Sequence, residues 1–77
     1  MITTNDLLTL GFEFQYEVKG REINYETYEK TINGLTIEVT NNFDDKTQIV
    51  EITQKNGFSE LKINNHIDLC SLINLLQ

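Results

Sequence analysis

The sequence of 77 residues contains no alanine, no proline and no tryptophan, and Cys70 is its single cysteine. One cysteine excludes an internal disulfide and a cysteine-rich metal knot, which fits a reducing compartment. A zinc site needs three or four nitrogen or sulfur ligands, and His66 is the only histidine that could join Cys70. An intermolecular disulfide stays open, although a lone helical cysteine is more often a small packed hydrophobe.

Long apolar runs are also missing from the chain. No stretch approaches the roughly 20 residues that a membrane-spanning helix needs. Residues 1–6 contain neither the basic region nor the apolar segment of a signal peptide. We therefore expect a soluble protein of the cytoplasm. With 39% hydrophobic and 23% charged residues the composition is globular, and the length predicts a single domain over residues 1–77.

Basic residues are scarce: 6 lysines and arginines stand against 12 acidic residues, giving a net charge of −6. A phosphate backbone would be repelled by most of such a surface, so direct binding to nucleic acid is disfavoured. A protein partner with a basic surface would be attracted instead.

A short helix is predicted near the N-terminus because its start and stop signals are complete. Thr3 can cap it, Asp6 three residues on completes a capping box, and Ile2 and Leu7 are spaced as a hydrophobic staple. Gly11 stands where a left-handed glycine ends a helix.

A second helix is predicted at the C-terminus, capped by Asn65 with Asp68 at the third position. Ile67 and Leu75 fall beside its apolar stripe, and we interpret them as edge-of-core contacts or as part of a frayed C-terminus, with a self-association patch as the alternative. The stripe itself is formed by Leu69, Leu72, Ile73 and Leu76.

Between these helices the apolar residues recur with the period of two that is typical of half-buried strands. Short connections favour pairing in sequence order. The sequence therefore predicts an α+β fold: helix, five-stranded antiparallel meander, helix, with the helices packed on one sheet face and the other face in solvent. The expected strands cover residues 12–18, 21–27, 35–39, 47–53 and 58–63.

The stretch from Thr27 to Gly34 allows two interpretations. Ile23 and Tyr25 have odd parity, whereas Tyr28 and Ile32 have even parity, so one strand cannot bury both pairs on one face. Either a β-bulge changes the face near residues 27–28, or the loop at the Asn-Gly hairpin signal has another length.

No enzyme chemistry is indicated. His66 and Cys70 are four residues apart in the C-terminal helix, but no third group is evident to orient a nucleophile and base. Glycines stand singly, so there is no phosphate-binding loop, and Asp44-Asp45 lacks the spacing of a calcium loop. We predict a non-enzymatic protein with no catalytic residues, no cofactor and no metal.

The first hairpin suggests a binding surface. If Lys19-Gly20 is a two-residue turn, Tyr16 faces Ile23 and Phe14 faces Tyr25 on the inner side. The outer side then becomes an acidic ladder in which Glu17 faces Glu22, Gln15 faces Asn24 and Glu13 faces Glu26.

This acidic ladder has two interpretations. It can simply keep the domain soluble, as charged faces often do. Alternatively, the six residues bind a Lys/Arg-rich groove such as one built to hold nucleic acid. The second interpretation depends on the register, because glutamates scattered over different surfaces would not form a docking site.

The sequence resembles short proteins encoded by phages and prophages of Bacteroidetes. The resemblance covers residues 4–13, the acidic and aromatic strand that follows, the closing segment 67–73 and the overall length. Small acidic phage proteins include anti-CRISPR proteins, which bind RNA-guided nucleases. The resemblance thus implies an inhibitor of a host defence effector, with a type VI RNA-targeting nuclease as the first partner to test. The alternative is a structural or accessory phage protein that acts as a homo-oligomer, for which a homodimer is one form.

Overall fold

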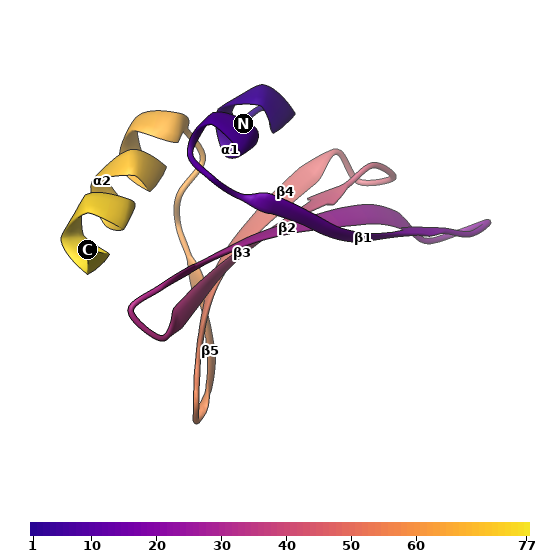
Figure 1. Ribbon diagram of the computed structural model, residues 1–77. Helices are drawn as coiled ribbons and strands as arrows, with labels where there is room; N and C mark the ends of the chain where they lie inside the picture. The colour runs from indigo at the N-terminus through magenta and orange to yellow at the C-terminus, as the bar shows by residue number, and fades with distance from the viewer.

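A computed structural model describes all 77 residues and confirms the predicted α+β meander. The sheet has the strand order β1-β2-β3-β4-β5, and every neighbouring pair is antiparallel. Both helices lie on the same face of the sheet, so the other face is left uncovered (Figure 1). Neither helix is long and apolar enough to cross a membrane. In chain order the elements are α1 (Thr4–Thr9), β1 (Glu13–Lys19), β2 (Asn24–Ile32), β3 (Leu35–Asn42), β4 (Thr47–Gln54), β5 (Gly57–Leu61) and α2 (His66–Leu76).

Helix α1 begins and ends as its sequence predicts. The Thr3 hydroxyl accepts the Asp6 backbone N–H at 3.1 Å. At the other end Gly11 has a φ of +92°, and the backbone N–H of Phe12 donates to the Leu7 carbonyl at 2.9 Å. This glycine-terminated turn closes the helix and leads the chain directly into β1.

Helix α2 is held at its N-terminus by a reciprocal pair of hydrogen bonds. The Asn65 side-chain oxygen accepts the Asp68 N–H at 2.9 Å, and the Asn65 amide donates to the Asp68 carboxylate at 3.0 Å. Ile67 is 66% and Leu75 is 83% exposed, so both lie off the buried stripe, as predicted. Neither packs against the core, so the interpretation as edge-of-core contacts is wrong.

The core fills the space between the helices and the inner face of the sheet. The helices and the three central strands contribute buried side chains at the positions that their periodicity turns inward. The edge strands β1 and β5 contribute no fully buried residue. The buried hydrophobic residues are Ile2, Leu7, Phe12, Tyr28, Ile32, Ile37, Val39, Val50, Leu69 and Ile73.

The Asn33-Gly34 turn has the two residues and positive φ angles, +50° and +83°, expected of a tight hairpin, and it pairs Ile32 with Leu35. Both interpretations of the preceding stretch were wrong. Strand β2 runs without a bulge, because Tyr25 simply turns to the uncovered face and Ile23 lies in the preceding turn, 56% exposed.

The predicted register of the first hairpin is also wrong. Strand β1 ends at Lys19, which pairs with Asn24, and the loop between them is closed by the Gly20 N–H donating to the Ile23 carbonyl at 2.7 Å. The longer loop shifts all partners, and the irregularity that was expected in β2 falls in β1 between Phe14 and Tyr16.

Aromatic packing gives a physical reason for this register. Phe14 meets Tyr28 edge to face with ring centroids 5.6 Å apart, and Tyr28 is buried beneath the helices. Tyr16 meets Tyr25 in the same way at 6.3 Å. The predicted alignment would have left Tyr28 without an aromatic neighbour in β1.

Helix α2 offers a matched test of this core. Leu69 is fully buried, so Leu69→Ala should lower the free energy of unfolding by about 2–5 kcal/mol. A domain of this size has a net stability of only about 3–5 kcal/mol, so much of the variant should be unfolded. Leu75→Ala, in the same helix but exposed, should change stability by less than about 0.5 kcal/mol. Urea denaturation followed by circular dichroism measures both, and equal effects would contradict the packing described.

Candidate functional site

The uncovered face of the sheet carries a line of glutamates that crosses every strand. Residues directly opposite each other in antiparallel strands point to the same face. Glu29 lies opposite Glu13 on one side and Glu38 on the other, and Glu51 lies opposite both Glu38 and Glu60. We call these residues, one from each strand of the five-stranded sheet, the glutamate row.

The glutamates of the row are evenly spaced because neighbouring strands in a sheet are evenly spaced. Adjacent strands lie about 4.8 Å apart, so the backbone positions of the row span about 19 Å from edge to edge. The twist of a sheet turns each strand by about 20–25° relative to the last, so the side chains fan out along the row. The result is a shallow spiral of carboxylates on one face of the molecule.

Threonines flank the row on the same face. They form hydroxyl pairs across strands: Thr27 with Thr40 at 3.2 Å, and Thr31 with Thr36 at 3.0 Å. Thr53 extends the second of these lines into β4. Because threonine side chains are short, the glutamate side chains extend further from the sheet than their neighbours do.

No lysine or arginine occupies a strand position on this face. The basic residues within strands are Lys19 and Lys30. Lys30 lies opposite the fully buried Ile37 and therefore on the inner side. Lys19 forms an ion pair with Glu17 at 3.8 Å, and Glu17 lies opposite Glu26 on that same inner side. Neither of the two ion pairs in the structure involves a glutamate of the row.

The centre of the row is electrostatically strained. Glu29, Glu38 and Glu51 are half-buried, whereas Glu13 and Glu60 at the two sheet edges are exposed. Partial burial raises the pKa of Glu38 above its usual value of 4.5, and the negative charges of Glu51 and then Glu29 raise it further. The protein holds this carboxylate ionised less readily than water would.

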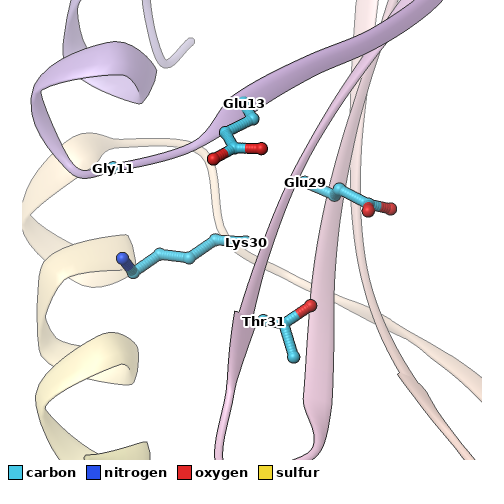
Figure 2. Close-up of a pocket in the computed structure, with 5 residues that line it drawn as sticks. All are labelled: Gly11, Glu13, Glu29, Lys30 and Thr31. Atoms are coloured by element: carbon cyan, nitrogen blue, oxygen red, sulfur yellow. The ribbon is translucent and has the colours of Figure 1, made fainter.

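At the β1 edge the row opens into a polar hollow of about 310 Å³ (Figure 2). The Lys30 side chain runs towards the helices beneath Gly11, and the Glu29 side chain points the other way. The Glu13 carboxylate lies over the hollow and is turned away from that of Glu29, so Glu13 continues the row by its position in the register and not by the direction of its side chain. A Cβ at Gly11 would lie 2.7 Å from the Lys30 ammonium. No carboxylate lies within ion-pair distance of this ammonium, so Lys30 does not neutralise the row.

The structure separates the residues predicted from the first hairpin. Glu13 belongs to the glutamate row, while Glu17 and Glu26 face each other on the inner side of the sheet. There Glu26 accepts a hydrogen bond from Asn41 at 3.2 Å. The predicted hairpin ladder therefore does not exist.

The remaining predicted residues lie in loop, edge and bulge positions. Glu22 is in the turn between β1 and β2, and Asn24 is the first residue of β2. Gln15 lies at the irregularity in β1, where its side-chain amide reaches the Glu13 carbonyl at 3.4 Å. None of the three joins a continuous acidic surface.

Sequence reasoning missed the four row members beyond β1, although a signal for them existed. Pairing outward from the two-residue Asn33-Gly34 turn sets Glu29 opposite Glu38. The turn after Gln54 is equally short and sets Glu51 opposite Glu60. Applying the hairpin rule to every turn would have found most of the row.

The other candidate pair, His66 and Cys70, lies on α2 without a hydrogen bond between the two side chains. The His66 ring nitrogen Nδ1 lies 3.9 Å from the Asp6 carboxylate, which links the start of α2 to α1. Cys70 is half-buried and free, and its thiol makes no hydrogen bond to the histidine. No three His, Cys, Asp or Glu side chains converge as metal ligands would.

Comparison with known proteins adds no relative to this picture. No family model matches the sequence, and neither a curated protein nor a solved structure matches it with significant similarity. The geometry of the chain itself is therefore the basis for a proposed function.

The strain at Glu38 predicts a stability that depends on pH. Because the folded state raises this pKa, the contribution of the group to stability is full below its unfolded value and is lost as pH rises through the folded value. Glu38→Gln removes the ionised form, so the variant should be more stable than the parent at neutral pH by a few tenths to about 1 kcal/mol. The difference should shrink as pH falls towards 4.5.

Urea midpoints for both proteins across this pH range measure the effect. Glu22→Gln is the matched control, because Glu22 lies in a turn with no glutamate opposite it. A Glu38→Gln variant that is less stable than the parent at neutral pH would contradict the assignment of strain to the row.

Proposed function

We propose that the chain is a non-enzymatic binding protein that docks the glutamate row on a Lys/Arg-rich surface of a protein partner. The observation that carries this proposal is the alignment of a glutamate on every strand of one uncovered face, without a basic residue among them. A basic surface supplies the countercharge that the protein lacks.

The energetics favour a role beyond solubility. Like charges directly opposite across strands are destabilising, by about 0.2–1 kcal/mol each, and the half-buried centre of the row contains two such contacts, Glu29 with Glu38 and Glu38 with Glu51. Their sum is on the order of 1 kcal/mol, against a net stability of about 3–5 kcal/mol. Glutamates spread over the surface would give the same solubility without this cost. A partner that neutralises the row would recover it.

The charge density of the row suits a groove that holds nucleic acid. It presents about one carboxylate per 4.8 Å, and one strand of a DNA duplex presents one phosphate per about 3.4 Å of axis. A channel lined by lysine and arginine for a phosphate backbone would therefore meet a comparable line of charge. A chain bound there would exclude the nucleic acid.

These features support an inhibitor of a nucleic-acid-binding defence effector, encoded by a phage and acting in the host cytoplasm. The resemblance to short phage proteins points in the same direction, towards an anti-CRISPR-like role. An RNA-guided nuclease of type VI is the first partner to test.

The homo-oligomer alternative must use other surfaces. Two uncovered faces packed together would oppose two glutamate rows, which strongly disfavours such a dimer. Ile67 and Leu75 on α2 and the open strand edges remain available for it. Light scattering on the purified protein separates a monomer from a stable dimer.

Two matched triple variants test the docking surface. Glu29→Gln, Glu38→Gln and Glu51→Gln together remove the centre of the row. Glu17→Gln, Glu22→Gln and Glu26→Gln remove the same number of charges from the first hairpin, outside the row. Inhibition of RNA binding by a type VI nuclease is measured by fluorescence anisotropy over a range of salt concentrations.

We expect the row triple to weaken inhibition by about tenfold or more and to flatten its salt dependence, because charge pairs across the interface are lost. The hairpin triple should retain most of the inhibition. Equal losses would mean that only net charge matters. For the parent protein, no inhibition at any salt concentration would rule out this nuclease as the partner.

A further inference from the structure

The uncovered face carries aromatic rings at both ends of the glutamate row. Tyr16 in β1 is 48% exposed, and Phe58 in β5 is 70% exposed. We propose that the row selects arginine over lysine, so that the partner segment it binds is arginine-rich; this inference rests on the proposed docking function.

The β5 end shows how a ring and a carboxylate share one ligand. Phe58 lies opposite Thr53, and Glu60 lies opposite Glu51, so all four side chains are on the uncovered face. Two residues along a strand span about 6.6 Å, which places the Phe58 ring beside the last two glutamates of the row. A guanidinium bonded to either carboxylate can therefore also stack on the ring.

At the β1 end a second ring lies on the uncovered face, three residues along the strand from Glu13 and beyond the irregularity. Tyr16 lies opposite Thr27 on the uncovered face, diagonal to Glu29. Its ring packs edge to face against Tyr25 at 6.3 Å with an interplanar angle of 77°. Thr27, which lies opposite Tyr16, is only 1% exposed, so this part of the uncovered face is closely packed.

Carboxylates alone would accept either basic residue. Arginine differs from lysine because its planar guanidinium bonds both oxygens of a carboxylate and stacks on an aromatic face at the same time. The lysine ammonium is a compact, strongly hydrated point charge that holds its water. A row of carboxylates with a ring at each end therefore favours arginine.

Nona-arginine and nona-lysine peptides are suitable probes because they have equal length and charge. We expect the parent protein to bind nona-arginine about threefold to tenfold more tightly at physiological ionic strength, by isothermal titration calorimetry. Phe58→Leu and Tyr16→Leu together should reduce nona-arginine binding to the nona-lysine level and leave nona-lysine unchanged.

Single variants keep the test independent of folding. Phe58 is the more exposed ring, so Phe58→Leu alone should preserve the fold and still remove part of the preference. Phe43→Leu is the matched control, because Phe43 is a half-exposed ring in the turn between β3 and β4, away from the row.

The outcomes distinguish this inference from the proposed function. Equal affinity for the two peptides, lost in the Glu29, Glu38 and Glu51 triple variant, would overturn arginine selection and leave docking by the row in place. Peptide binding that is indifferent to the triple variant would overturn both. A preference that Phe43→Leu removes as readily as Phe58→Leu would overturn the role of the rings.

Discussion

Register is the constraint on which both the core and the candidate site depend. The short turn at Asn33-Gly34 fixes which residues of β2 and β3 face each other, and this single alignment sets Tyr28 beside Val39 and Glu29 beside Glu38. Because successive side chains alternate between faces, a slip of one residue would bury the glutamates and expose the core. The buried apolar row and the exposed acidic row are therefore two sides of the same pairing, and neither can change without the other.

This coupling explains why the acidic row is tolerated. Val39 and Val50 are almost fully buried directly beside Glu38 and Glu51 in the sequence, so the burial that stabilises the fold forces the carboxylates into opposition. Burying each valine is worth about 1.5–3 kcal/mol, which exceeds the repulsion of one opposed pair of glutamates. The fold can support the row, but lysine at alternate strands would remove the repulsion without disturbing the core. The chain has glutamate there instead.

The sequence predicted the parts of the fold that depend on local signals. Thr3, Gly11 and Asn65 mark helix ends through hydrogen bonds and backbone angles within a few residues, and the strands follow from their alternation. The first hairpin failed because Lys19-Gly20 has the composition of a two-residue turn, whereas the observed loop continues to Ile23. The length of this loop depends on contacts between residues far apart in the sequence, chiefly the packing of Tyr28 under the helices. A local sequence pattern does not contain this information. The predicted acidic ladder depended on this register, so it was wrong for the same reason.

The ends of the row bear on whether the face binds a partner or a second copy of the chain. Strands β1 and β5 both leave their outer backbone groups unpaired, which is a liability for edge-to-edge association. Glu13 and Glu60 stand exposed on these edge strands, and charged side chains on an edge discourage the addition of another strand. The two end members of the row thus also make edge-to-edge association of two copies less favourable. The charges on the face and on its edges therefore favour the proposed docking of a basic partner over the pairing of two copies through their sheets.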